Sequence, residues 1–367
     1  MANEKNHVKE PLFHIAKRDQ IPLWKSIVIR ALAIIAGFIF CGIICAVVIG
    51  KNPFKLYESM FDGVFGSSRR MWKMAKDLAV LLCIALGITP AFKMRFWNIG
   101  AEGQVLMSCL ASVACIIYFG GKVSNAVLLV IMFAASVITS AVWATIPAIF
   151  KAKWNTNETL FTLMMNYVAT YLVAYFLIVW VPSGSSTLGT LQHGWLPTIG
   201  GSIDKQGYLL LILIVAALTV AMFIYLKYSK HGYEISVVGE SQRTACYIGI
   251  NVKRVIIRTL VVSGAICGIA GFLIVSALDH SVTTVSVGGQ GFTAIMVSWL
   301  AKFNPFLMVL TSFLIVFLRQ GADQFATNSN INNAFPSVIV GIMLFFIIGC
   351  EFFINYRIIF RKKEIIK

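Results

Sequence analysis

The feature that most constrains this chain is a succession of long apolar stretches separated by short polar ones. Of the 367 residues, 58% are hydrophobic and only 13% are charged, whereas a soluble domain carries about 25% charged residues. The stretches run on without the period-2 alternation of a membrane β-barrel. The sequence therefore predicts an all-α polytopic membrane protein, and it excludes a soluble globular enzyme, a disordered protein and a nucleic-acid-binding module.

Ten apolar stretches predict about ten transmembrane helices. They cover residues 27–50, 78–91, 101–119, 126–150, 160–181, 207–228, 256–278, 292–301, 305–318 and 336–354. The second, eighth and ninth are short for a crossing, which takes about 20 residues. They are either broken helices, which transporters often place near substrate sites, or longer helices that extend into flanking polar residues.

Lysine and arginine residues predict the orientation of the chain. With both termini in the cytoplasm, 22 of the 31 basic residues fall inside and nine fall outside, as membrane insertion favours. We therefore divide the chain into a cytoplasmic segment (1–25), a single transmembrane domain (26–355) with an inside loop (228–255), and a basic cytoplasmic tail (356–367). The net charge of +16 is assigned to this topology and not to nucleic acid. Segment 51–77 carries six basic residues outside, so we expect it to lie partly on the outer surface as an amphipathic stretch.

No metal site, disulfide framework or catalytic group is expected. Seven of the eight cysteines lie inside apolar stretches, none belongs to a CxxC pair, and the five histidines are scattered. No G-x-x-x-x-G-K-[ST] phosphate loop occurs, so this chain is expected to carry no ATPase of its own.

A faint internal repeat links the two halves of the chain. Ile99-Gly-Ala-Glu-Gly103 is echoed by Val287-Gly-Gly-Gln-Gly291, and Ser108-Cys-Leu-Ala111 by Ser298-Trp-Leu-Ala301. The copies fall on the third and eighth stretches, five crossings apart. They would have opposite orientations, as in a five-plus-five inverted repeat.

The strongest local motif is Phe96-Trp-Asn-Ile-Gly-Ala-Glu-Gly-Gln104, which joins the second and third stretches. It brings Asn98, Glu102 and Gln104 into a membrane helix, where a carboxylate costs about 2.5–3.5 kcal/mol. Glu102 therefore either faces a water-filled path or sits at the membrane surface as a helix N-terminal charge.

Two further segments carry polar residues in helical spacing. Glu158, Thr162 and Asn166 share one helix face, which serves either as a substrate wall or as a source of inter-helix hydrogen bonds. The polar inside segment 232–254 predicts a short helix with an apolar face, which is suited to docking a soluble partner.

These segments together resemble the permease subunits of ABC importers in the branched-chain amino acid, ribose and nucleoside group. The likeness is greatest to the nucleoside/simple-sugar branch. It rests on Asn98-Ile-Gly-Ala-Glu-Gly-Gln104, on Glu158 with Asn166-Tyr167, on segment 232–254 with its Val-Gly-Glu and Tyr-Ile-Gly-Ile-Asn core, and on Gly291-Phe-Thr-Ala-Ile-Met-Val-Ser-Trp-Leu-Ala-Lys-Phe-Asn-Pro305.

The resemblance implies a multi-pass subunit of the bacterial plasma membrane that moves a nucleoside or simple sugar by alternating access. It implies three partners besides the bilayer: a cytoplasmic ABC ATPase, a second homologous permease and an extracytoplasmic substrate-binding lipoprotein. ATP and magnesium would be held by the ATPase, and this chain would carry no cofactor. The expected substrate-path residues are Phe96, Trp97, Asn98, Glu102, Gln104, Glu158, Thr162 and Asn166. The expected ATPase-coupling residues are Gly239, Glu240, Ala245, Tyr247, Gly249 and Ile250.

Three alternatives remain at this level. An ion-coupled secondary transporter needs a buried chain of acidic residues, for which only Glu102 and Glu158 qualify. A membrane-embedded enzyme needs a nucleophile–base or metal-ligand spacing that the sequence lacks. Within the importer interpretation, a branched-chain amino acid is the alternative substrate.

Overall fold

The computed structural model describes residues 13–18, 22–181, 188–198, 208–332 and 334–360. Within them, nine helices are long and apolar enough to cross a membrane, so the prediction of an all-α polytopic membrane protein is confirmed. They are α1 (Leu23–Val47), α3 (Ser68–Lys93), α4 (Ala101–Phe119), α5 (Asn125–Trp154), α6 (Glu158–Trp180), α7 (Leu209–Tyr228), α10 (Val252–Leu273, continued by the π-helix η1, Ile274–Asp279), α12 (Pro305–Ser329) and α13 (Phe335–Asn355). The shorter elements are α2 (Pro53–Phe65), α8 (Lys230–Glu240), α9 (Gln242–Tyr247), α11 (Gln290–Leu300) and the strands β1 (Phe13–Lys17) and β2 (Tyr356–Phe360).

Two of the three short apolar stretches belong to full-length helices, and the third is a short helix. The second and ninth extend into polar flanks as the full-length helices α3 and α12, of 26 and 25 residues. The eighth stays short, because α11 has 11 residues, about half the rise that a bilayer core requires. In the described part of the chain, nine of the ten expected crossings therefore correspond to long helices, and the eighth corresponds to the short helix α11.

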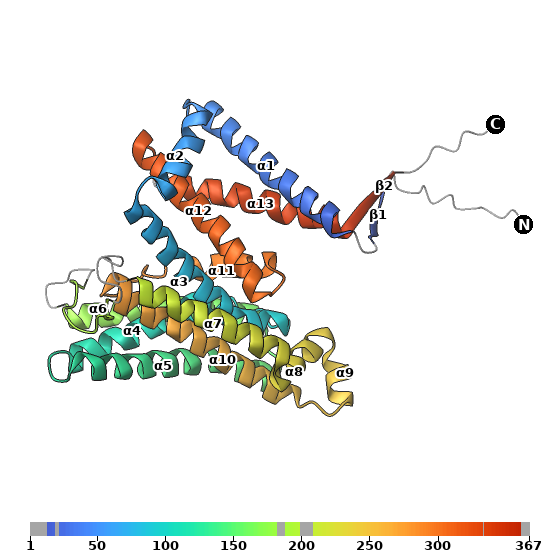
Figure 1. Ribbon diagram of the computed structural model, residues 1–367. Coiled ribbons are helices and arrows are strands. Elements are labelled where there is room, and N and C mark those ends of the chain that lie inside the picture. The colour runs from blue at the N-terminus through green and yellow to red at the C-terminus, as the bar shows by residue number, and fades with distance from the viewer. Residues whose placement is uncertain (1–12, 19–21, 182–187, 199–207, 333, 361–367) are drawn as a thin grey trace, which may run out of the picture. The chain divides into compact units, whose positions relative to one another are not determined.

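The chain forms two compact units, Met1–Gly63 with Leu318–Lys367, and Val64–Phe317. These units are defined by packing, whereas the predicted boundaries at residues 25 and 355 are topological and stay predictions. In the first unit, α1 lies along α13 (Figure 1), and Arg30 Nε donates to Glu351 Oε1 at 3.0 Å. The small antiparallel pair β1–β2, which the sequence did not predict, joins the two ends of the chain.

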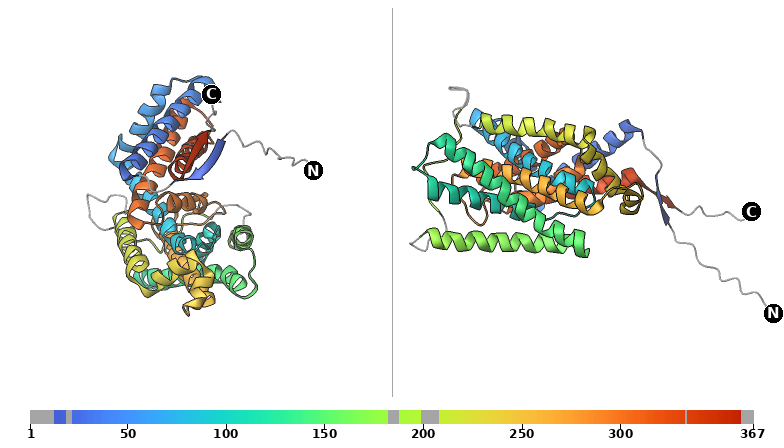
Figure 2. Two further views of the ribbon diagram at one scale, coloured as in Figure 1. Left: turned by 90° about the vertical axis from the view of Figure 1, so that its right-hand side faces the viewer. Right: turned by 90° about the horizontal axis from the view of Figure 1, so that it is seen from below.

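In the second unit, α10 packs between α3, α4 and α5 (Figure 2). Glycines on α10 permit this close approach. A Cβ at Gly264 would lie 2.6 Å from Ser140 O, and one at Gly268 would lie 2.7 Å from Val137 Cα, both on α5. Further along α10, close to its C-terminal end, Gly271 lies against Ser108 of α4. Helix α4, whose first turn carries the strongest sequence motif, therefore packs directly against α10.

Candidate functional site

Asn98 is a fully buried hub at the turn between α3 and α4. Its Oδ1 accepts a hydrogen bond from the Gly100 N–H at 3.0 Å and one from Gln104 Nε2 at 3.3 Å. Its Nδ2 lies 3.5 Å from Ser263 Oγ on α10. The side chain thus fixes the first turn of α4 and ties it to α10. These hydrogen bonds explain why a polar amide can be fully buried here.

Glu102 reaches from the first turn of α4 to the start of α11. Its Oε1 accepts the Gly289 N–H and its Oε2 accepts the Gly291 N–H, each at 2.8 Å. The first N–H groups of a helix lack intrahelical partners and favour a negative charge. Glu102 is therefore the N-terminal charge of a second helix, an arrangement that neither sequence alternative contained.

The polar stripe of α6 makes inter-helix hydrogen bonds to the same turn. Thr162 Oγ1 accepts the Ile99 N–H at 3.1 Å. Asn166 accepts the Gly103 N–H at 2.8 Å through Oδ1 and donates to Ile99 O at 2.9 Å through Nδ2. Because a Cβ at Gly103 would lie 2.9 Å from Asn166 Oδ1 and 3.0 Å from Asn166 Cα, any larger residue would force these helices to shift.

The other expected path residues lie around this junction. Glu158 begins α6 and pairs with Lys151 Nζ at 2.8 Å. Phe96 is buried, whereas the Trp97 side chain is 44% exposed and packs on Phe92 and Trp299, with ring centroids 5.9 and 5.2 Å apart. Gln104 is buried, and its Oε1 has no hydrogen-bond partner in the described part of the chain. The eight residues therefore form a mostly buried polar junction rather than an open wall, and their role in transport stays a prediction.

The expected coupling segment forms the two short helices α8 and α9, which we call the coupling cap (Lys230–Tyr247). Ser229 and Ser241 begin them as N-caps, accepting the N–H groups of Gly232 and Thr244. The cap is seated tightly, because a Cβ at Gly239 would overlap the Lys93 carbonyl oxygen at the end of α3.

The coupling residues divide into buried and exposed groups. Gly239 and Ala245 are buried, and Ile250 is half-buried. Glu240 and Gly249 are exposed, and the Tyr247 side chain is 92% exposed. Gly249 has φ of +84° with open space around its Cα, so it permits a left-handed turn that other residues rarely adopt.

The coupling cap and the polar junction share one apolar cluster. Ile235, Val238 and Ala245 of the cap belong to one buried cluster with Met94 and Phe96, which lie four and two residues before Asn98. Interiors are close-packed and transmit strain. A displacement of the cap would therefore be felt at the turn before α4 through this one packed cluster.

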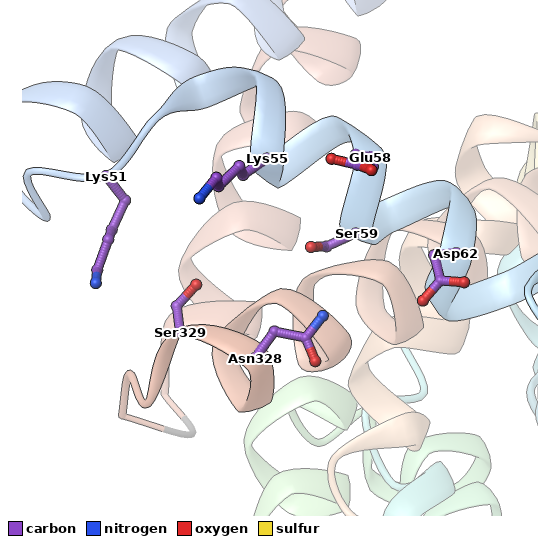
Figure 3. Close-up of a pocket in the computed structure, with 7 residues that line it drawn as sticks. All are labelled: Lys51, Lys55, Glu58, Ser59, Asp62, Asn328 and Ser329. Carbon is purple, nitrogen blue, oxygen red and sulfur yellow. The ribbon is translucent and has the colours of Figure 1, made fainter.

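A separate polar hollow of about 370 Å³ lies between α2 and the end of α12 (Figure 3). Lys51 and Lys55 line it together with Glu58 and Asp62. None of the expected site residues takes part. Its wall is the polar side of α2, which the sequence predicted as an amphipathic stretch. Among the described residues, no group of three histidine, cysteine or acidic side chains is arranged to hold a metal ion.

A family model described as "Branched-chain amino acid transport system / permease component" matches residues 70–348. The chain belongs to this family and is a multi-pass membrane permease of the ABC transporter type. It is 24% identical to the glucose ABC transporter permease protein TsgB13 of Haloferax volcanii, over 93% of this chain and 92% of that one. It is 25% identical to the guanosine permease NupP of Bacillus subtilis, over 88% and 92% of the two chains. It is also 25% identical to the nucleoside permease NupB of Lactococcus lactis, over 88% and 91%. The resemblance to the nucleoside/simple-sugar branch is thereby confirmed.

Proposed function

We propose that this chain is the permease subunit of an ATP-driven importer that moves a nucleoside or a simple sugar across the plasma membrane by alternating access. The observation that carries the proposal is the contact of the coupling cap with Met94 and Phe96. It gives a soluble motor a direct mechanical route to the polar junction, which ties α4, α6, α10 and α11 together. The names of the relatives support the substrate class.

The motor is a separate cytoplasmic ATPase that holds ATP and magnesium, and this chain supplies no cofactor and no catalytic residue. Glu240 and Tyr247 on the coupling cap, and Gly249 just after it, are exposed and suit a direct contact with that ATPase. Gly239 and Ala245 seat the cap on the membrane helices. ATP binding shifts the bundle between outward- and inward-facing states by differential contact with the cap.

On the outer side, a substrate-binding lipoprotein delivers substrate to this chain and a second homologous permease. A basic hollow of about 380 Å³, lined by Arg69, Arg70, Lys73, Lys76 and Tyr208, supports this role. Basic residues on the outer side oppose the usual membrane bias, so they serve an interaction. An acidic face on the lipoprotein would match them and speed its encounter with the permease.

The test is uptake by vesicles that contain the permease pair and its ATPase, with the lipoprotein added outside the vesicles. Radiolabelled guanosine, glucose and leucine are offered in turn, with ATP supplied on the ATPase side or with a sodium or proton gradient alone. We expect ATP-dependent uptake of guanosine or glucose, no uptake on a gradient alone, and better competition by purine nucleosides than by leucine. The control is an ATPase variant that cannot hydrolyse ATP. Gradient-driven uptake would favour a secondary transporter, and uptake of leucine alone would move the substrate to branched-chain amino acids.

A further inference from the structure

Helix α6 presents a row of three tyrosines on the face opposite its buried polar stripe. Tyr167, Tyr171 and Tyr175 are spaced one helical turn apart, and their side chains are 57%, 73% and 61% exposed. Among the described residues of its unit, the main packing partners of α6 are α4 and α5 (Figure 2), through Thr162 and Asn166 among others. We call these three residues the tyrosine row.

The tyrosine row occupies the middle of a membrane-spanning helix, where tyrosine is out of place against lipid. Tyrosine and tryptophan favour the two membrane interfaces, and elsewhere on the described spans the exposed ones follow this rule. Tyr118, Trp154 and Tyr228 all lie at helix ends. The outward face of α7, by contrast, carries Leu213, Val220 and Ile224 along its length.

The phenol hydroxyls make lipid contact still less favourable. None of the three has a hydrogen-bond partner among the described residues, and burying a hydroxyl in hydrocarbon without a partner is costly. The face is therefore better suited to water or a polar group than to lipid. A separate hollow of about 360 Å³ near the start of α6 is lined by Asn157, Leu160, Phe161, Met164, Met165 and Val168, and none of the three tyrosines takes part in it.

The chemistry of the face selects the ligand. Aromatic rings stack on the faces of bases, and phenol hydroxyls donate or accept hydrogen bonds. The outward face of α6 carries no charged side chain, since Glu158 is the only charged residue of the helix and is paired with Lys151. A zwitterionic amino acid would bring two charges that this face leaves unpaired.

We propose that the tyrosine row is a wall of the transport path that contacts an uncharged, ring-bearing solute such as a nucleoside or a hexose. The proposal rests on the transport function proposed above and identifies the surface on which the solute travels. It shifts the contact from the buried polar junction, which the sequence indicated, to the opposite face of α6.

The first test measures water access and needs no substrate. Cys246 is the only exposed one of the eight cysteines. The Cys246→Ser variant therefore removes the native thiol that a reagent would modify in the assembled complex. Tyr171→Cys is compared with Val220→Cys, which is exposed in the middle of α7. A membrane-impermeant methanethiosulfonate reagent, applied to both sides of the membrane, should modify Tyr171→Cys at least about tenfold faster than Val220→Cys. Equal rates would place the row against lipid or packed protein and overturn the proposal.

The second test asks which solute the row contacts. Tyr171→Leu should reduce uptake by about five-fold to a hundred-fold, which is the range for one lost stacking contact, whereas Tyr171→Phe should retain most of it. Val220→Leu is the matched control and should be neutral. Radiolabelled guanosine and glucose are tested separately, and the solute whose uptake falls is the one bound. Normal uptake by Tyr171→Leu would contradict the proposal. If the wild-type complex imports neither solute, the transport function is wrong, while the result of the access test still stands.

Discussion

The carboxylate of Glu102 accepts the backbone N–H of Gly291 at 2.8 Å, and this bond joins corresponding places in the two halves of the chain. In the internal repeat, Gly103 aligns with Gly291 and Glu102 aligns with Gln290. The two copies of the motif are therefore in direct contact. The copies differ at three positions, and the one that holds a carboxylate in one copy and an amide in the other is the one that makes the bond.

This contact predicts that Gly291→Ala separates α4 from α11. A Cβ at Gly291 would lie 2.5 Å from Glu102 N and 2.7 Å from Glu102 Oε2, so the two helices have to move and both carboxylate bonds weaken. We expect a melting temperature several degrees lower and loss of uptake. The control is Gly341→Ala on α13, where a Cβ has open space and alanine favours the helix. Equal melting temperatures for the two variants would contradict a close contact between Gly291 and Glu102.

The Glu102 side chain predicts a graded series. Glu102→Gln keeps the size of the side chain but only one acceptor oxygen, so one of its two bonds is lost and transport should weaken mildly. Glu102→Leu leaves two N–H groups unpaired, at about 1–3 kcal/mol each, and should weaken transport severely, as should Asn98→Leu. Uptake is measured at matched membrane abundance after ATPase binding has been verified. Full transport by assembled Glu102→Leu protein would move the important contact elsewhere.

The sequence predicted the class of fold and the places where polar residues gather, because both are local properties. Hydropathy finds the apolar centre of a span, and helical spacing correctly placed Thr162 and Asn166 on one face. The short helix expected in segment 232–254 is present as α8, followed by α9, and its place on the inside stays a prediction. Spans were underestimated where a polar end belongs to the helix. For example, Ser67 caps α3, and Arg69 and Arg70 lie in the first turn of the helix, which hydropathy counts as loop.

The partners of the polar residues could not be predicted from the sequence. Glu102 bonds to residues 187 and 189 positions away, and periodicity describes only neighbours on one helix. The exposed tyrosine face of α6 could have been predicted from the sequence. Three tyrosines spaced four residues apart lie within one apolar stretch, on the face opposite the polar stripe.

The orientation predicts opposite labelling of two cysteines by an impermeant maleimide on intact cells. Gln192→Cys, on the exposed part of the segment between α6 and α7, should label directly. The native Cys246, exposed on α9, should label only after permeabilisation. The two positions are measured separately, with Cys246→Ser as the background for the first. The reverse pattern would invert the topology that the 22-to-9 distribution of basic residues predicts.

The coupling cap predicts that Gly249 is essential for communication and not for assembly. Gly249→Trp forces a bulky residue into a φ of +84° at an exposed position, so the turn changes shape and the ATPase contact is lost. Uptake and substrate-stimulated ATP hydrolysis should both disappear while the protein still inserts. Gly249→Asn is the matched control, because asparagine tolerates positive φ better than other residues. Unchanged ATP hydrolysis with Gly249→Trp would contradict the proposal that this segment contacts the ATPase.

Finally, His231 predicts a pH dependence of the coupling cap. The ring is buried between Tyr225 Oη and Thr259 Oγ1. Burial, with a smaller contribution from the charge of Arg258, lowers the pKa of His231 below its ordinary 6.5, and Glu234 partly offsets this. The neutral ring is thus the folded form. Its stabilisation is present above pH 6.5 and is lost as the pH falls through the lowered folded-state pKa.

We therefore expect the melting temperature of the assembled complex and its ATP-driven uptake to fall together as the pH drops below 6.5. His231→Gln keeps a polar side chain that does not titrate, and it should flatten this profile. His193→Gln, at an exposed histidine, serves as the control and should keep the wild-type profile. The pKa of His280 is also lowered by burial, so His280→Gln measures its separate share. A profile that His231→Gln leaves unchanged would assign the titration to another group.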